Sequence, residues 1–546
     1  MNNKLIIVGI DGGTFEVINE LIKNGHLPTF KYIIENGVSA NLISTIPPVT
    51  GAAWPSMLTG VNPGKHGVFD FIEYCPEKYD GWFNKSFVDS SCLAGKTFLD
   101  LLSNKGELVG GIAIPVTYPP WEINGILVSG YPCPDTNTNY VFIRNVNITE
   151  DEIPPLNFSA EYYQIASEKK IAEDGYKMTR TRTELALKLW TENDFRCLFF
   201  VLGETDRAQH NFWKYYRKNL RDKEDVVTNT YIEVDKSIQK ILNKIDNETT
   251  LFLVSDHGGG ERPRTYFYIN EFLKKEGYIV LNKTTIWEHF YSFLKKTKAK
   301  SKLFRKLYFN ISARLDKKSS DWIMHTSAKT FVSKINFSRT KAYMYPMQFP
   351  AFGIVINKKN RQPEGIVDDQ EYEKLREEII LKLNQLKDDK GRKIVSMVFK
   401  REEIYKGPFL KKAPDIVALT TEYFEANKDF PNRMFGSVPD VEYDRLNGYH
   451  RMEGIFIAYG KHIKKGIKIN KMSIMDIAPN VLYLLGHEIP TYIDGSVKPE
   501  IFENNFVNSQ KPKYVEREFI PSTKKHVFSE QDKDEIRKKL EPLGYL

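Results

Sequence analysis

The sequence predicts an α/β fold, with a mainly parallel central sheet that is covered by helices on both faces. Two observations lead to this prediction. Short, almost continuously apolar runs recur along the chain, and helical patterns separate several of them. Strands buried on both faces have such sequences, because all their side chains pack against other elements. The hydrophobic content of 41% and the charged content of 27% are those of a soluble globular protein.

The elements follow in chain order. The stretch that starts with "KLIIVGIDGGTF" predicts a buried strand, a glycine turn and a helix with a period near 3.6. Further strands are expected in four apolar runs, at residues 125–132, 196–206, 250–260 and 454–460. Helical patterns lie at 181–193 and 226–245, and a packed helix and turn are expected at 473–490.

Residues 266–430 have a different character and are expected to form a cap inserted into the core. The core would then occupy residues 1–265 and 431–510, and residues 511–546 would be a C-terminal tail. The cap contains a basic, aromatic-rich segment, 286–318, with apolar residues at helical spacing. One interpretation is a helix that packs this stripe on the core. The other is an interfacial helix in peripheral contact with anionic lipid.

Composition limits the cellular locations and the partners that are expected for the protein. The first residues lack the pattern of a signal peptide, and no apolar run is long enough to cross a membrane. Four scattered cysteines argue against a disulfide framework and favour a cytoplasmic location. The net charge of +8 is modest for 546 residues, so no nucleic-acid binding is expected. The sequence does not predict an oligomeric state.

Carboxylate and imidazole side chains recur where strands end, which in parallel sheets is the edge that carries function. In "LFLVSDHGGG" (251–260) a strand runs into Asp256 and His257, and the glycines are expected to keep the space in front of them open. Asp206 and His210 are four residues apart, a spacing that places both on one face of a helix. With Asp11 and His450 the set suits two divalent ions, which together can run in-line phosphoryl transfer.

Thr50 is the candidate nucleophile. It stands where a Pro- and Gly-rich loop, "STIPPVTGAAWPSMLTG", turns into a helix. The structural alternative is that Thr50 is an N-cap. The functional interpretation uses the same position, because free backbone N–H groups at a helix start can hold a phosphate oxygen. A bound ion would supply the activation that a threonine hydroxyl needs.

Over nearly its whole length the chain resembles the alkaline phosphatase superfamily, and most closely the type I phosphodiesterase/nucleotide pyrophosphatase branch. The motifs that carry the resemblance are "VGIDGGTF", the Asp-x-x-x-His of Asp206 and His210, "SDHG", the late His450, and Thr50 ten residues before the glycine of "TGVNPGKHG". The resemblance implies an alkaline phosphatase-like sheet, one ion held by Asp206, His210 and His450, and another held by Asp11, Asp256, His257 and the Thr50 hydroxyl.

The implied reaction is a two-step hydrolysis of a small-molecule phosphodiester or phosphoanhydride through phospho-Thr50. Zinc is the expected metal, with manganese as the alternative. The branch's nucleotide pyrophosphatases carry an asparagine three residues after the threonine, and this chain has Ala53 there. Phosphate is therefore expected to contact the backbone of Gly51 and Ala52, or a residue from elsewhere in the chain. The loop 357–367 of the cap is open to two interpretations: a substrate loop with Arg361 facing the leaving group, or a solvated loop.

Alternatives remain at this point. A phosphatase or phosphotransferase on the same fold, acting on a lipid- or glycan-linked phosphate, has the same motifs. A non-catalytic anion-binding protein is disfavoured because the ligand set is complete. His66, Lys65, Arg207 and Arg451 lie close to the motifs in sequence, and each is open to a structural interpretation as well as a role at the site.

Overall fold

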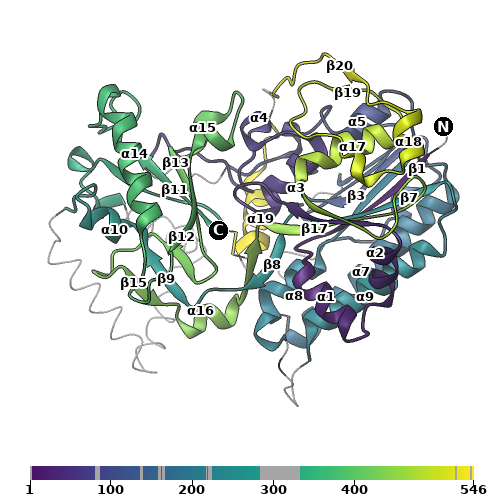
Figure 1. Cartoon of the computed structure of the whole chain (residues 1–546), viewed down its shortest axis with the longest axis horizontal. Coiled ribbons are helices and arrows are strands. Elements are labelled where there is room, and N and C mark those ends of the chain that lie inside the picture. Colours follow the sequence, from purple (N-terminus) through teal and green to yellow (C-terminus); the bar gives the residue numbers. More distant parts are fainter. Residues whose placement is uncertain are drawn as a thin grey trace.

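The structure is a computed structural model. It describes residues 3–79, 86–135, 139–157, 162, 166–216, 218, 224–282, 332–522, 525–541 and 544–545. The basic segment 286–318, and with it the predicted interfacial helix, lies outside these residues. Figure 1 shows two lobes, a larger one around the main sheet and a smaller one around residues 342–420.

The larger lobe is built on a sheet whose nine described strands follow the order β18-β2-β17-β7-β1-β6-β3-β4-β5. Neighbouring strands are parallel except where β17 meets β2 and β7 and where β5 meets β4. The strand bounds are β1 Lys4–Ile10, β2 Val38–Ile43, β3 Val109–Ile114, β4 Gly125–Ser129, β5 Val141–Ile143, β6 Cys197–Leu202, β7 Thr249–Val254, β17 Glu453–Gly460 and β18 Ile467–Ser473.

Strand β1 lies at the centre of this sheet, between β6 and β7. Its side chains alternate between two apolar layers, with Leu5 and Ile7 in one layer and Ile6, Val8 and Ile10 in the other. All five are buried. This alternation requires helices on both faces, because a strand buried on both sides has no face left for water.

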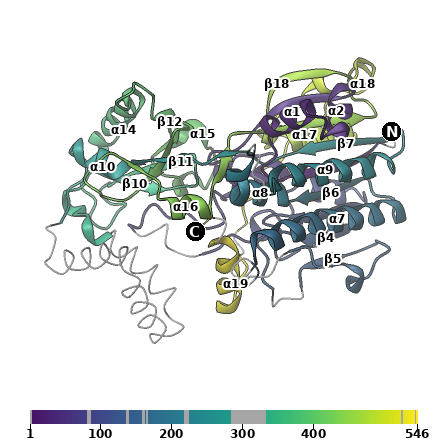
Figure 2. The ribbon, with the colours of Figure 1, turned by 90° about the horizontal axis from the view of Figure 1, so that it is seen from below.

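The helices supply those two layers. The layer that contains Leu5 is formed by α3 Thr50–Thr59, α5 Phe98–Ser103 and α17 Ile477–Leu484. The layer that contains Val8 is formed by α1 Phe15–Lys23, α2 Pro28–Glu35, α7 Glu168–Glu192 and α9 Val226–Leu242. Figure 2 shows α7 and α9 side by side along the sheet. Buried residues of these helices pack on both faces of the sheet and complete the core of the lobe.

The smaller lobe has its own sheet, in the order β10-β11-β13-β12 with antiparallel neighbours. Helix α14 packs on β12, and α10 contacts β10. A three-stranded sheet, β14-β9-β15, lies in the same lobe, where β14 contacts β13 and α10. The bounds are β9 Thr265–Tyr268, α10 Ile269–Lys275, β10 Ala342–Pro346, β11 Ala351–Ile356, α14 Asp369–Gln385, β12 Val395–Lys400, α15 Arg401–Ile404, β13 Ile416–Thr420, β14 Phe424–Asn427 and β15 Phe435–Ser437.

Short elements complete the larger lobe. A two-stranded pairing of β8 with β16 lies beside the carboxyl ends of β1 and β7, and α8 follows β6. The bounds are α4 Pro63–His66, α8 Glu204–Phe212, β8 Gly258–Glu261, α16 Asp440–Arg445, β16 Gly448–Arg451, β19 Ile489–Pro490, α18 Asn504–Ser509, β20 Tyr514–Val515 and α19 Glu530–Leu540.

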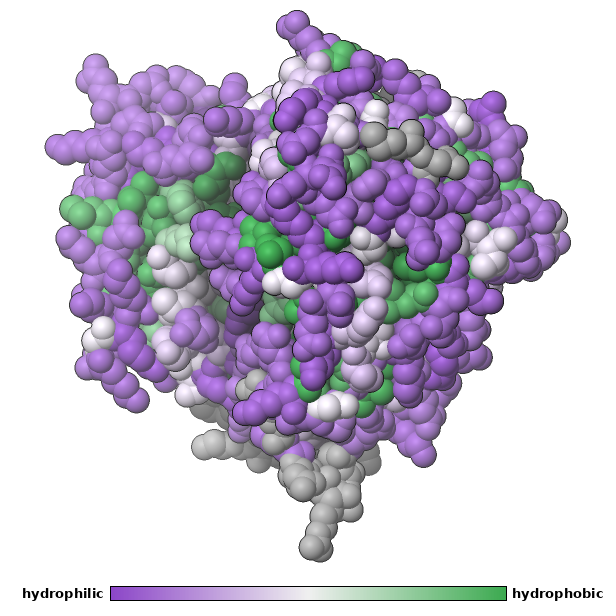
Figure 3. All heavy atoms as spheres, turned by 45° about the vertical axis from the view of Figure 1, so that its right-hand side comes forward, coloured by the Kyte–Doolittle hydropathy of each residue, from purple (hydrophilic) through white to green (hydrophobic). Residues whose placement is uncertain are grey.

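The predicted fold class is confirmed: a mainly parallel sheet with helices on both faces. The helical pattern at 226–245 corresponds to α9, and that at 181–193 is the second half of the longer α7. The predicted domain boundaries stay a prediction. Among the described helices none has the length and apolar content to cross a membrane. Figure 3 shows a face that is largely hydrophilic, with a few hydrophobic areas.

Candidate active site

The first candidate metal group lies at the carboxyl ends of β1 and β7, the two central strands. Asp11 follows β1 directly, and Asp256 and His257 follow β7. One donor atom from each side chain lies within 4.8 Å of the other two, and all three residues are buried. The adjacent parallel strands bring these residues together, because they end at the same edge of the sheet.

The second group is formed by Asp206 and His210 of α8 with His450 of β16. Asp206 and His210 lie one helical turn apart, and Oδ1 of Asp206 is 3.3 Å from Nε2 of His210. The Nε2 atoms of His210 and His450 are 3.0 Å apart. The two groups adjoin, since the rings of His257 and His450 stack with their centroids 3.9 Å apart.

The donor atoms fit divalent cations. Nδ1 of His210 lies 2.8 Å from the carbonyl oxygen of Gly448, and Nδ1 of His257 lies 3.0 Å from that of Gly258. A hydrogen bond at Nδ1 leaves Nε2 as the atom that can bind a metal. Oδ2 of Asp256 is buried and has no hydrogen-bond partner among the described residues. A buried carboxylate oxygen without a donor is costly unless a cation is bound beside it.

The electrostatics of the first group agree with this fit. Burial, followed by repulsion from Asp256 and Asp206, raises the pKa of Asp11 well above its ordinary value. Burial and the charge of Asp206 raise the pKa of Asp256 to about 7. Asp11 and Asp256 therefore resist ionisation, whereas the imidazoles of His210 and His450 hold the pKa of Asp206, despite its burial, below its ordinary value. Cations beside Asp11 and Asp256 would remove that resistance.

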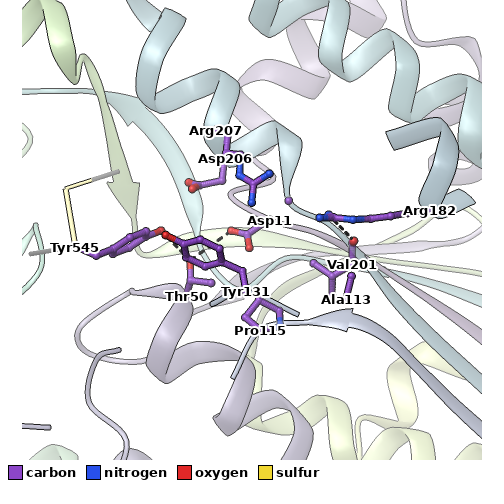
Figure 4. A pocket seen from close by; sticks show the side chains of 11 residues that line it. Asp11, Thr50, Ala113, Pro115, Tyr131, Arg182, Val201, Asp206, Arg207 and Tyr545 are labelled. Atoms are coloured by element: carbon purple, nitrogen blue, oxygen red, sulfur yellow. Dashed lines mark hydrogen bonds between the residues drawn. The ribbon is translucent and has the colours of Figure 1, made fainter. Parts of the chain in front are cut away.

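Thr50 is the first residue of α3, and its hydroxyl is directed at the first metal group. Oγ1 lies 3.2 Å from Nε2 of His257 and 3.5 Å from Oδ1 of Asp11. The N-cap of α3 is Val49, and no side chain caps this helix. The N-cap interpretation of Thr50 is therefore wrong. The alternative, a hydroxyl held at the helix start beside an ion, agrees with the geometry (Figure 4).

Gly51 and Ala52, the expected phosphate contacts, occupy the next two positions of α3. The N–H of Ala52 donates to the carbonyl of Val49 at 2.9 Å and is thus already used within the helix turn. A Cβ on Gly51 would lie 2.6 Å from the backbone nitrogen of Phe71, so only glycine fits there. Of the two, Gly51 is the better candidate for a backbone donor to phosphate.

Arg361 does not occupy the predicted position. Its guanidinium forms a two-pronged ion pair with Asp415 inside the cap, with both N–O distances at 2.6 Å. Asp415 is buried, so this pair neutralises a charge in the interior of the cap. Arg361 is absent from the cavity lining beside Thr50. The expected contact with a leaving group was wrong, because sequence did not reveal the buried aspartate that binds the arginine.

The sequence left the roles of His66, Lys65, Arg451 and Arg207 open. In the structure three of them make contacts away from the cavity beside Thr50, and one lines it. Nε2 of His66 lies 2.8 Å from the hydroxyl of Ser56, and Lys65 binds Asp494 and the carbonyl of Tyr492. Arg451 donates to the carbonyl of Glu261 at the β8–β16 pairing. Arg207 alone of the four lines the cavity beside Thr50, where its guanidinium lies over the ring of Tyr131.

Three further residues with polar side chains line this cavity and were not predicted: Arg182, Tyr131 and Tyr545. Arg182 is a buried residue of α7 that donates to Glu204, the first residue of α8. No local pattern marks these residues, because each reaches the site from an element distant in sequence.

The glycines after His257 serve a different purpose from the one expected. They form β8, and their missing side chains allow close packing. A Cβ on Gly259 would lie 2.0 Å from the side-chain oxygen of Gln209, and one on Gly258 would lie 2.1 Å from the carbonyl oxygen of Glu453. The space beside these glycines is therefore filled by the Gln209 side chain and the Glu453 backbone, and is not open.

Comparisons with known proteins identify a family for this chain. The model of a family described as type I phosphodiesterase / nucleotide pyrophosphatase matches residues 5–433. A search of proteins with curated functions gave no match. Among solved structures, murine ectonucleotide pyrophosphatase / phosphodiesterase 5 is 15% identical with a TM-score of 0.45, covering 91% of this chain and 97% of its own. The human protein of that name is 14% identical with the same TM-score, covering 93% and 99%.

The protein is a phosphoester hydrolase with two candidate groups for divalent metal ions. It belongs to the type I phosphodiesterase / nucleotide pyrophosphatase family, whose model matches most of its length. The resemblance seen in the sequence motifs is thereby confirmed.

Proposed function

We propose that the protein hydrolyses a small-molecule phosphodiester or phosphoanhydride in two steps, with Thr50 as the nucleophile. One observation carries the proposal: the Thr50 hydroxyl lies beside His257 and Asp11, at the first metal group. A side chain that served only the fold would not need to face these two buried candidate ligands at the start of a helix.

The ions would lower the pKa of the Thr50 hydroxyl and of a water molecule, and would neutralise charge on the phosphoryl oxygens. Thr50 Oγ1 attacks phosphorus, and the bond from phosphorus to the leaving oxygen breaks. Water then attacks the phosphothreonine and releases phosphate or a phosphomonoester, which returns the hydroxyl to Thr50. The backbone N–H of Gly51, in the first turn of α3, would hold a phosphoryl oxygen.

Zinc is the metal we propose, since each group combines imidazole with carboxylate, and manganese is the alternative. An inactive variant of the murine protein named above has been solved in complex with AMP. A nucleotide substrate for this chain is part of the proposal, although Ala53 provides no side-chain donor. A cytoplasmic location, supported by the scattered cysteines, and lipid contact through 286–318 remain proposals from the sequence.

The test uses three nitrophenyl substrates: the phosphomonoester, the bis-nitrophenyl diester and nitrophenyl thymidine monophosphate. The protein is stripped of metal and restored with zinc or manganese. Thr50→Ala should lower turnover of the diester by at least about a thousandfold, because it removes the hydroxyl that lies beside His257 and Asp11. Thr59→Ala is the matched control, since Thr59 is a buried threonine at the other end of α3.

Preference for the monoester would assign a phosphatase instead. Transfer of the phosphoryl group to added alcohols in place of water would assign a phosphotransferase. Turnover that survives Thr50→Ala would refute Thr50 as the nucleophile. Mass spectrometry of the acid-quenched protein should find the phosphoryl group on the peptide that contains Thr50.

A further inference from the structure

The side chain of Tyr545 lies inside the candidate active site. Its hydroxyl is 3.1 Å from Oγ1 of Thr50, and the residue is only 3% exposed. The ring packs edge-on against Phe71 with centroids 4.8 Å apart, and lies 5.9 Å from the ring of His450. Figures 1 and 2 both place this end of the chain between the two lobes, and Figure 4 shows the ring pointing at Thr50.

Helix α19 precedes residues 544–545 and determines where they enter the site. Ile536 and Leu540 are buried in the same apolar layer as α3. Nζ of Lys539 binds Asp135 at 2.6 Å, and the carbonyl of Lys539 accepts a hydrogen bond from Tyr131 at 2.6 Å. The helix is thus anchored on the loop after β4. Gly544 and Tyr545, beyond this anchor, reach into the site.

Tyr545 occupies the direction from which a substrate has to approach. Of the contacts of the Thr50 hydroxyl, those with Asp11 and His257 lie on the side of the metal group, and the remaining one is with Tyr545. Attack requires phosphorus within about 3–3.5 Å of the nucleophile. The cavity left beside Thr50 is about 30 Å³. A single water needs about 10–15 Å³ on such a measure, so the space holds water but no phosphoester.

We propose that Tyr545 occupies the phosphoryl subsite of the resting enzyme as a built-in competitor, and that substrate binds only when residues 544–545 withdraw. This inference rests on the proposed function of Thr50. The phenol hydroxyl stands where a phosphoryl oxygen would approach Thr50, and its ring lies beside the candidate metal ligand His450. The affinity for any phosphate ligand is then reduced by the fraction of molecules in which the segment has withdrawn.

The test measures binding of inorganic phosphate to the zinc-loaded protein by calorimetry, in five forms. These are the full chain, Tyr545→Phe, Tyr545→Ala, a chain that stops after Glu541, and Tyr514→Ala. Tyr514 is a 60% exposed tyrosine of β20 and serves as the matched control. The Michaelis constant for the bis-nitrophenyl diester is measured on the same samples, and their melting temperatures verify folding.

Tyr545→Phe should bind phosphate about fivefold more tightly, because it removes one hydrogen bond that competes with the ligand. Tyr545→Ala and the shortened chain should bind more than about tenfold more tightly and show a lower Michaelis constant. A synthetic peptide of residues 538–546, "KKLEPLGYL", should compete with phosphate for the shortened chain. Tyr514→Ala should match the full chain.

Unchanged or weaker phosphate binding in Tyr545→Ala would overturn the proposal. Tighter phosphate binding in Tyr545→Ala and the shortened chain, without turnover of the diester in any form, would refute the proposed hydrolysis and leave this inference standing. A loss of turnover in Tyr545→Phe with phosphate affinity unchanged would make Tyr545 an assistant of Thr50 and overturn its role as a competitor. Failure of every form to bind phosphate would also overturn it, because there would be no phosphoryl subsite to occupy.

Discussion

His66, which lies close to the sequence motifs, holds two segments of the fold together. Its Nδ1 accepts the N–H of Val68 at 3.1 Å, so Nε2 carries the proton that is donated to Ser56 of α3. The side chain is buried, and burial lowers its pKa to about 3 from an ordinary 6.5. A neutral imidazole thus ties α4 to the helix that carries Thr50.

We predict that His66 makes the stability of the fold depend on pH. Between pH 6.5 and 3 the unfolded chain binds a proton at this position and the folded chain does not. The free energy of unfolding should therefore fall as the pH is lowered through this range, by about 1.4 kcal/mol per pH unit at most. Urea unfolding at pH 5 and pH 7 measures the change. His66→Gln, which cannot titrate, should show a smaller difference between the two values, and an equal difference would refute the assignment.

At the scale of elements, the close approach of β8 to α8 sets the position of the ligands. The amide nitrogen of Gln209 donates to the carbonyl of Gly12 at 2.8 Å, next to Asp11, and its oxygen lies against Gly259. Gly12 itself has a φ of +66°, and a Cβ there would lie 3.0 Å from Oδ1 of Asp206. Both glycines allow backbone to approach the α8 side chains beside the metal groups.

Gly259→Ala should therefore disturb the site. The added methyl group would lie 2.0 Å from the Gln209 oxygen, and moving Gln209 would release Gly12. We expect a loss of about 1–3 kcal/mol in stability together with weaker zinc binding. Gly175→Ala is the control, because a Cβ there meets only Glu204 at 3.8 Å within helix α7, and alanine there should be neutral or stabilising. Equal zinc affinity in both variants would contradict the argument.

The start of α8 depends on a buried ion pair. Arg182 donates to Oε2 of Glu204 at 3.2 Å and to the carbonyl of Val201 at 3.1 Å, and both side chains are at most 3% exposed. Arg182→Met should lower the free energy of unfolding by about 3–5 kcal/mol, because it leaves a buried charge with less compensation. Adding Glu204→Gln should recover part of that loss. A double variant less stable than the single one, in urea unfolding, would show that the pair itself is not the cause.

The sequence was sufficient to predict those site residues that lie in a local motif or directly after a strand. Asp11, Asp256 and His257 follow strands β1 and β7, and Asp206 and His210 share one face of α8, so local pattern was sufficient. Arg361 was misassigned, because its role depends on Asp415, which is 54 residues away. Tyr545 was missed, because its contact with Thr50 spans 495 residues and no periodicity records it. Strands β2 and β3 were missed, since they contain serine, asparagine or glycine in place of a long apolar run.

At the scale of the whole molecule, the metal groups unite segments from residue 11 to residue 450. No single segment holds a complete ligand set, so the ions would bind the folded chain far better than the unfolded one. Such binding stabilises the fold by about 2.7 kcal/mol when free metal is at a hundredfold its dissociation constant.

A chelator should therefore lower the melting temperature of the zinc-loaded protein by about 2–5 °C for one or two ions, because an unfolding entropy of about 2.1 cal/mol/K per residue gives about 1 °C per kcal/mol for 546 residues. Scanning calorimetry with and without the chelator measures the shift. In Asp256→Asn, with one ligand of the first group removed, the shift should be smaller. An identical melting temperature with and without chelator would mean that the buried carboxylates do not hold ions that matter for folding.

The position of β17 in the main sheet also bears on how the protein is made. Strand β2, residues 38–43, has β17 on one side and β18 on the other, and these begin at residues 453 and 467. A ribosome that adds about 5–20 residues per second releases the first partner about 20 to 80 seconds after β2 has emerged. During that interval both edges of the nascent β2 lack their native partners. Newly made chains are therefore expected to need chaperone protection of this strand until the far end of the sequence has been translated.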